Sequence, residues 1–150
     1  MKEEARNQRQ RDILDAALAQ LIETGFAGTT MQAVARRAGA SMETLYNWYG
    51  DKAGLFRAMV MANIEHLRNQ LETRLNDPAG PEAVLAAFGP RLLEVLTSER
   101  VVALNRAAVA DSSGELGRII ASAGRQSIAP LVAGAFAEAA RAGVLRPPDP

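Results

Sequence analysis

Apolar residues recur along this chain at the three- and four-residue spacing of an α-helix, and no segment shows the alternation of a half-buried β-strand. Segment 11–25 carries one apolar stripe, made of Ile13, Leu14, Ala17, Leu18, Leu21 and Ile22. Segment 52–75 repeats the spacing with Leu55, Met59, Ile64, Leu67, Leu71 and Leu75. Because a single periodicity runs through the chain, we predict an all-α protein.

The composition excludes several function classes. The chain has no cysteine, which rules out disulfides and thiolate metal sites, and His66 is its single histidine. No segment approaches the ~20 apolar residues of a membrane span, and no glycine-rich phosphate loop or G-x-S-x-G motif is present. We therefore predict a cytoplasmic protein without a membrane segment that is not an enzyme and uses no cofactor and no metal.

Turn and capping residues divide the first fifty residues into three helices, the second at about 31–38 and the third at about 42–48. Three glycines are placed to end these helices: Gly25, Gly39 and Gly50. Side chains that cap helix starts precede the second, third and fourth helices: Thr29 or Thr30, then Ser41, then Asp51. The spacing predicts three helices within the first fifty residues, followed by one long fourth helix.

The sequence after residue 75 changes character. The stretch 76–81 reads NDPAGP, which is typical of a linker, and three alanine-rich helical segments follow it, at 81–99, 100–113 and 115–143. Pro90 and Pro130 lie inside these helical patterns, where we expect them to kink the helices. We predict two domains, a three-helix domain at 1–50 and a C-terminal helical bundle within 51–150, joined by the long fourth helix.

The second and third helices have the spacing of a helix-turn-helix. Two short helices that pack closely need a small residue at their contact, a glycine in the turn and an apolar anchor on the second helix. Ala35, Gly39 and Leu45 stand in that relation. The second helix of such a motif enters the DNA major groove. Here its outward positions carry polar and aromatic groups: Ser41, Glu43, Thr44, Tyr46, Asn47 and Trp48.

Residues 11–55 resemble the DNA-binding domain of the TetR (tetracycline-repressor-like) family of transcriptional regulators. The resemblance rests on a helix ending in TGF, followed by TTMQAVARRAGAS and then by TLYNWYGDKAGLF. The alanine-rich remainder is similar in character to the ligand-binding and dimerisation domain of that family. Members usually continue beyond the equivalent of Pro150 with two helices that build most of the dimer interface, so we expect either a truncated chain or a different interface.

The resemblance implies DNA-binding roles for residues of these two helices and their flanks. Thr30 or Thr29 would place the amides of the second helix at a phosphate, and Lys52 would meet a phosphate at the start of the fourth helix. Asn47 is able to read adenine, and the methyl group of Thr44 is able to pack on thymine. The full predicted set comprises Thr29, Thr30, Arg36, Arg37, Ser41, Met42, Glu43, Thr44, Tyr46, Asn47, Trp48, Tyr49 and Lys52.

Several of these residues also have a structural interpretation. Tyr49 fits the core better than a DNA contact, and Trp48 fits equally well against the fourth helix or at the DNA backbone. Arg36 and Arg37, taken alone, suit a solvated helix face. Met42 stands where the family commonly has a basic or polar residue, and the formal net charge of the chain is zero. We therefore expect modest non-specific affinity for DNA.

The predicted function is DNA-binding transcriptional regulation, by a repressor that binds a palindromic operator in double-stranded DNA as a homodimer and is released by a small hydrophobic ligand. Small residues let the C-terminal helices approach closely, whereas kinks at Pro90 and Pro130 would open gaps between them. There we predict a pocket lined by Phe88, Leu92, Leu104 and Phe136. A packed bundle core is the structural alternative for these four residues. The alternative function is an all-α protein-interaction module whose helix-turn-helix no longer reads DNA.

Overall fold

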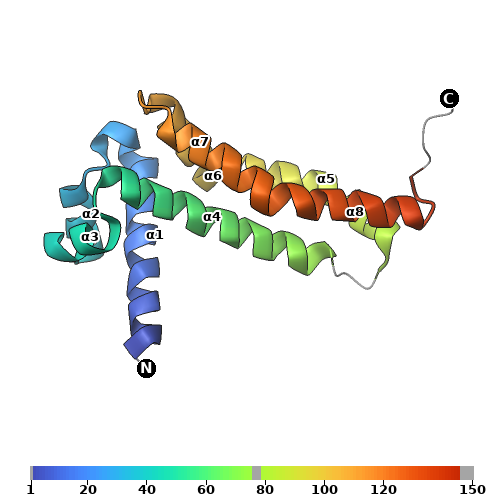
Figure 1. Cartoon of the computed structure of the whole chain (residues 1–150), viewed down its shortest axis with the longest axis horizontal. Helices are drawn as coiled ribbons and strands as arrows, with labels where there is room; N and C mark the ends of the chain where they lie inside the picture. Colours follow the sequence, from blue (N-terminus) through green and yellow to red (C-terminus); the bar gives the residue numbers. More distant parts are fainter. Residues whose placement is uncertain (1, 76–78, 146–150) are drawn as a thin grey trace. The chain divides into compact units, whose positions relative to one another are not determined.

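The computed structural model describes residues 2–75 and 79–145, and helices are the only regular elements within them (Figure 1). The elements are α1 (Lys2–Gly28), α2 (Met31–Ala38), α3 (Met42–Tyr49), α4 (Lys52–Leu75), α5 (Pro81–Leu96), α6 (Glu99–Ala110), α7 (Glu115–Ala123), the π-helical turn η1 (Gly124–Ile128) and α8 (Ala129–Arg141). The predicted all-α fold is confirmed. No helix in the described part of the chain is both long and apolar enough to cross a membrane.

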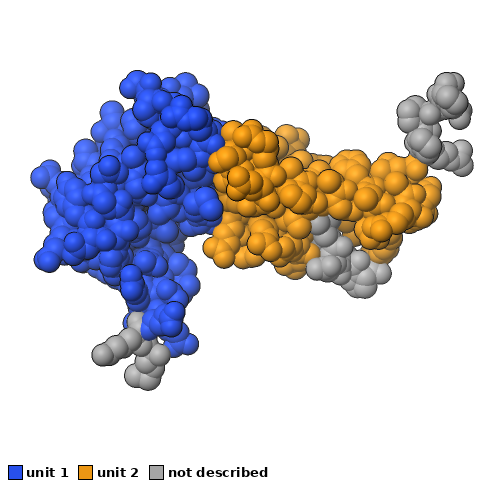
Figure 2. Space-filling model, viewed as in Figure 1, with its two compact units in different colours: residues 1–63, 99–120 blue, residues 64–98, 121–150 orange. Residues whose placement is uncertain are grey.

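Two compact units group these elements, and Figure 2 colours them separately. Unit 1 comprises residues 1–63 and 99–120, and unit 2 comprises residues 64–98 and 121–150. The long helix α4 therefore contributes its first half to unit 1 and its second half to unit 2. The domain division at residue 50 stays a prediction. The predicted linker at 76–81 lies partly outside the described residues.

The first helix is longer than its apolar stripe. α1 begins at Lys2, well before the predicted start near Arg11, because the preceding segment KEEARNQRQ consists mostly of residues with high intrinsic helix propensity. At the other end Gly25, which the sequence predicts as the end of the helix, has a φ of 71° and interrupts it, and helical residues continue to Gly28. Ile22, which the spacing places in the buried stripe, is 39% exposed. The helix thus adds a polar N-terminal extension to its buried portion.

Unit 1 closes around one face of α1. Buried side chains from four helices form its core: Ile13, Ala17, Leu21, Val34, Ala35, Leu45, Leu55, Phe56 and Met59. The Phe26 ring meets the Phe56 ring edge-on, with the centroids 5.1 Å apart. In Figure 1, α2 lies beside α1 and α3 lies beside α2, and α6 also packs against α1. This core holds the first half of α4 to the three helices that precede it.

The turn between α2 and α3 has the geometry that the sequence predicts. Gly39 adopts the left-handed conformation (φ 57°, ψ 35°), and the N–H of Ala40 donates to the carbonyl oxygen of Ala35 at 2.9 Å. Ala35 and Leu45 are both buried on the facing sides of the two helices. The helix-turn-helix is therefore formed by the residues that predict it.

α4 starts in direct contact with the end of α3 at Gly54. A Cβ atom added to Gly54 would lie 1.8 Å from the carbonyl oxygen of Tyr49, so the backbone would have to move. The N–H of Gly54 also donates to Oδ1 of Asp51 at 2.8 Å, which confirms Asp51 as the cap of α4. The close approach at Gly54 thus sets how the third and fourth helices join.

Replacing Gly54 by alanine should lower the free energy of unfolding by about 1–3 kcal/mol, because the new methyl group forces the two helix ends apart. Urea denaturation monitored by circular dichroism would measure the change. Gly89→Ala is the matched control, since a Cβ atom at that helical glycine meets nothing within 4 Å. Equal stability changes in the two variants would contradict the importance of the close approach.

Unit 2 has a smaller core between the second half of α4, α5 and α8. Leu67, Leu71 and Phe88 are buried, and a ring of partly buried residues packs against them: Leu92, Val95, Ile128, Leu131 and Val132. In Figure 1, α5 and α8 run side by side. Leucine and valine from three helices therefore supply most of the apolar surface that holds this unit together.

One expected kink takes a different form. Pro130 lies in the first turn of α8, directly after the π-helical turn, and not inside a continuous α-helix. The N–H of Ala129 donates to the carbonyl oxygen of Gly124, five residues earlier. A widened turn accommodates Pro130, which has no N–H to donate. Pro90, in contrast, lies inside α5 as expected.

Candidate nucleic-acid interface

The start of α2 exposes its capping residue. Thr30 has an extended backbone (φ −99°, ψ 157°), and its Oγ1 accepts a hydrogen bond from the N–H of Ala33 at 3.1 Å. The structure therefore selects Thr30, and not Thr29, as the cap. Thr29 is fully buried and donates from Oγ1 to the carbonyl oxygen of Gly25 at 2.8 Å. Thr29 thus ties the interrupted end of α1 to the start of α2.

Replacing Thr29 by valine should lower the free energy of unfolding by about 1 kcal/mol, because the Gly25 carbonyl loses its donor while the buried volume hardly changes. Urea denaturation would measure the loss, and Thr29→Ser, which retains the hydroxyl, is the companion variant. The Thr29→Val protein should keep its affinity for DNA at temperatures where it is fully folded. A large loss of affinity in the folded variant would show that Thr29 does more than support the interior.

α3 divides into two faces. Leu45 is fully buried, and Trp48 and Tyr49, three and four residues further on, are half-buried on the same side. The other side is open to solvent and carries Glu43, Tyr46 and Asn47. Tyr46 is 50% exposed although it is a large aromatic residue. The arrangement leaves one polar and aromatic surface of α3 available to a binding partner.

The first turn of α3 is organised by Ser41. Its Oγ accepts a hydrogen bond from the N–H of Thr44 at 3.0 Å and lies 2.8 Å from the Thr44 Oγ1. Ser41 is exposed, whereas Thr44 and Met42 are half-buried. Both hydroxyls are therefore oriented by the helix cap before any partner arrives.

The two arginines at the end of α2 differ in their surroundings. Arg37 makes a bidentate ion pair with Glu23, with N–O distances of 2.6 and 2.5 Å. The hydrogen bond between them lowers the pKa of Glu23 and raises that of Arg37. Arg36 is exposed and makes no ion pair with any residue that the structure describes. Arg36 is thus available to an anion, whereas Arg37 already has a carboxylate partner.

The aromatic residues at the end of α3 pack against each other and against α1. The Trp48 and Tyr49 rings meet edge-on, with centroids 6.5 Å apart. The guanidinium of Arg6 lies over the Trp48 ring, 5.9 Å from its centroid. The Tyr49 hydroxyl is buried without a hydrogen-bond partner among the described residues, and burial raises the pKa of this phenol. Tyr49 therefore packs inward, in line with its interpretation as a structural residue and not a DNA contact. Trp48 contacts α1 through Arg6.

Lys52 turns its ammonium toward the protein. Its Nζ donates to the carbonyl oxygen of Phe26 at 2.5 Å and lies 4.0 Å from the centroid of the Phe26 ring. The Phe56 ring is also close, with its centroid 5.8 Å from Nζ. Burial lowers the pKa of Lys52. The residue that the resemblance assigns to phosphate contact thus also links the end of α1 to the start of α4.

The polar extension of α1 brings two further cations to this surface. Arg9 donates from Nη2 to the carbonyl oxygen of Gly39 at 2.6 Å, at the turn of the helix-turn-helix, and Arg6 reaches Trp48 one turn earlier. Neither arginine belongs to the predicted DNA-binding set. The sequence signal for their placement is the high helix propensity of residues 2–10, because a continuous helix carries Arg6 and Arg9 alongside α3.

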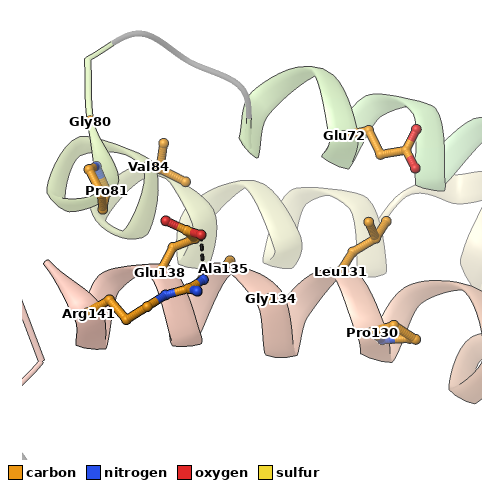
Figure 3. Close-up of a pocket in the computed structure, with 10 residues that line it drawn as sticks. All are labelled: Glu72, Gly80, Pro81, Val84, Pro130, Leu131, Gly134, Ala135, Glu138 and Arg141. Carbon is orange, nitrogen blue, oxygen red and sulfur yellow. Dashed lines mark hydrogen bonds and ion pairs between the residues drawn. The ribbon is translucent and has the colours of Figure 1, made fainter.

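Unit 2 contains a cavity of about 520 Å³ between α5, α8 and the second half of α4 (Figure 3). Its lining comprises Glu72, Gly80, Pro81, Val84, Pro130, Leu131, Gly134, Ala135, Glu138 and Arg141. Arg141 and Glu138 form an ion pair at 2.5 Å along this wall. The cavity thus combines an apolar surface with three charged side chains.

The four residues predicted to line a pocket lie elsewhere. Phe88 and Leu92 belong to the core of unit 2, and the Phe136 ring meets the Phe88 ring edge-on at 6.4 Å. Leu104 is buried in unit 1, where it borders a separate hollow of about 20 Å³. None of the four lines the 520 Å³ cavity. The small residues Gly134 and Ala135 and the prolines Pro81 and Pro130 border it instead.

Comparison with known proteins agrees with this architecture. Residues 13–59 match the family described as bacterial regulatory proteins of the tetR family, and residues 83–150 match the C-terminal domain of AefR-like transcriptional repressors. The HTH-type transcriptional regulator BetI of Serratia proteamaculans is 36% identical over 67 residues, which are 45% of this chain and 34% of that protein. The chain therefore spans about a third of the length of this curated relative.

Two solved structures match nearly the whole chain. A TetR-family regulator from Mesorhizobium loti has a TM-score of 0.80 and 29% identity, over 95% of this chain and 73% of that one. A TetR transcriptional regulator from Agrobacterium tumefaciens has a TM-score of 0.71 and 33% identity, over 95% of this chain and 72% of that one. These relatives are all described as transcriptional regulators. The chain belongs to the TetR family of bacterial transcriptional regulators.

Proposed function

We propose that this regulator is a repressor that binds a palindromic operator as a homodimer. The observation that carries the proposal is the solvent-facing surface of α3, which holds Tyr46 and Asn47 outward while Leu45 anchors the helix to the core. A helix-turn-helix places this surface in the major groove. Two copies related by a two-fold axis would read two half-sites one DNA turn, ~34–36 Å, or a multiple of it apart.

Each predicted contact has a distinct chemical role in this proposal. The Asn47 amide would pair with the N6 and N7 edge of adenine, and the Thr44 methyl would pack on a thymine methyl. The hydroxyls of Ser41 and Tyr46 would donate hydrogen bonds to the sugar-phosphate backbone that forms the walls of the groove. Thr30 would bring the backbone amides of α2 to a phosphate. Arg36 supports the proposal because it is an exposed cation on α2 that is available to a phosphate.

We infer that a small hydrophobic ligand releases the DNA by binding in the cavity of unit 2. A volume of about 520 Å³ lies in the range of ~300–1,000 Å³ usual for ligand pockets. The FadR regulator of Bacillus subtilis, which shares the fold at 17% identity, was solved in complex with stearoyl-CoA. Such a ligand would lower operator affinity if it binds more tightly to a conformation in which the two α3 helices of the dimer no longer match the spacing of the half-sites. By reciprocity, bound DNA would weaken ligand binding by the same factor.

Selection of duplex DNA from a random library by the purified chain at low salt tests operator binding. Enrichment of an inverted repeat would support a dimeric regulator and supply the half-site spacing. The Tyr46→Ala variant, folded by circular dichroism, should lose much of that enrichment, whereas Asn47→Ala should still enrich an inverted repeat but with no preference at one base pair in each half-site. A folded parent chain that enriches no sequence would favour the alternative of a protein-interaction module.

Filling the cavity tests ligand release separately. A Cβ atom at Gly134 meets nothing within 4 Å, so Gly134→Leu should enter the cavity without disturbing the backbone, and Gly134→Ala is the smaller control. Stearoyl-CoA and free fatty acids of graded length would be titrated against the operator complex. The proposal expects a ligand that weakens DNA binding by the parent and by Gly134→Ala, and less by Gly134→Leu. An identical response of all three proteins would place the ligand elsewhere.

A further inference from the structure

The helix-turn-helix has few unpaired cations with which to meet DNA phosphates. α3 carries Glu43 and no lysine or arginine. Arg37 is already paired with Glu23, and the Lys52 ammonium is held by the Phe26 carbonyl oxygen. Because phosphate neutralisation supplies much of the affinity of DNA-binding proteins, a surface with this charge distribution needs cations from another element.

The N-terminal extension of α1 supplies such cations and is held in position against the helix-turn-helix. Arg9 donates to the carbonyl oxygen of Gly39, the residue that ends α2 in the left-handed conformation. A cation at this position also interacts favourably with the C-terminal end of the α2 dipole. Arg9 therefore acts as a positioning residue that fixes the extension beside the turn.

Arg6 lies one turn earlier on the same side of α1, over the face of Trp48. Trp48 is in turn oriented by its edge-on contact with Tyr49. A guanidinium that lies over an aromatic ring is held in place through its face, while the N–H groups at its edge stay able to bind a phosphate in a bidentate manner. Trp48 thus serves as a platform that presents Arg6 at the end of the recognition helix.

We propose that Arg6, held over Trp48, binds a backbone phosphate of double-stranded DNA, so that the α1 extension forms a second DNA-contacting element beside α3. This inference rests on the proposed operator binding. It assigns the chain's single tryptophan the role of supporting the phosphate-binding Arg6. It assigns Arg9 the role of holding the α1 extension in place beside the turn.

Salt titration of DNA affinity tests the proposal with the full chain and the duplex obtained by selection. Each phosphate contact that is lost lowers the slope of log affinity against log salt by about 0.9. Arg6→Gln, which removes two contacts from a dimer, should therefore reduce the slope by about 2 and the affinity by at least about tenfold at low salt. Arg6→Lys should keep most of the slope, because it keeps the charge.

Arg11→Gln is the matched control. Arg11 is an exposed arginine of the same helix that donates to Gln8 and lies roughly 140° around the helix axis from Arg6. Its removal should leave the slope unchanged. Fluorescence of the single tryptophan provides a second readout, since Arg6→Gln should change the Trp48 emission of the free protein while circular dichroism stays the same.

The outcomes separate this inference from the operator proposal. If the parent chain binds DNA and Arg6→Gln binds with the same slope and an affinity within twofold, Arg6 makes no phosphate contact and the inference is wrong. If Arg11→Gln loses as much slope as Arg6→Gln, the extension contributes only diffuse charge, which also overturns it. If the parent binds no duplex at any salt concentration, both the operator proposal and this inference fail.

Discussion

Replacing Asn47 by alanine should abolish preference for one base pair in each half-site while the fold stays intact. Asn47 is exposed on α3, so its removal opens no cavity in the core. A bidentate contact to a base contributes about 1–3 kcal/mol of discrimination, and a dimer would lose it twice. We therefore expect specific affinity to fall by about 2–6 kcal/mol, with little change in non-specific binding.

The measurement is competition between the selected operator and operators substituted at each position, for the parent and for Asn47→Ala. Asn105→Ala is the control, because Asn105 is also an exposed asparagine on a helix of unit 1 and donates to the Val101 carbonyl oxygen. The variant should become indifferent to the identity of one base pair per half-site. An unchanged preference at every position would show that Asn47 does not read a base.

Replacing Phe56 by alanine should lower the free energy of unfolding by about 3–5 kcal/mol, the cost of deleting a fully buried aromatic side chain. Phe56 has no exposed surface, and its ring packs edge-on against Phe26. The Lys52 ammonium lies near the same two rings. Such a loss is a large fraction of the ~5–15 kcal/mol stability typical of a domain.

Urea denaturation of Phe56→Ala would be compared with that of Phe136→Ala, since Phe136 is 44% exposed and should cost less. We also expect Phe56→Ala to weaken DNA binding near its melting temperature, because the ring joins the N-terminal part of α4 to the end of α1. A loss of stability below about 1 kcal/mol would mean that the surrounding helices collapse into the space left by the ring.

The helix boundaries of the helix-turn-helix follow from local sequence. The spacing predicts the second helix at 31–38, where it forms, and the third helix ends only one residue later than its spacing predicts. The glycines and caps act on the residues next to them, so the sequence carries enough information. Gly39, Ser41 and Asp51 therefore behave as their spacing predicts.

The extent of α1 and the place of the cavity did not follow from the same patterns. Periodicity detects a buried face, and the first ten residues have none, although their helix propensity is high. The cavity depends on which helices meet, and unit 2 brings the start of α5 and the length of α8 together with Glu72 of α4. The large residue Phe88 fills the core of unit 2, and the small residues Gly134 and Ala135 border the open space.

Local sequence was sufficient for the all-α class, the three helices around the turn and the polar outer face of α3, because helix periodicity, caps and left-handed glycines act within a few residues. Contacts between distant segments needed the folded chain. The burial of Thr29, the pairing of Arg37 with Glu23, the capture of Lys52 by Phe26 and the placement of Arg6 over Trp48 all join residues whose proximity arises only when α1 packs against its neighbours. Side-chain hydrogen bonds and ring contacts act over a few ångströms, and sequence spacing does not report that distance.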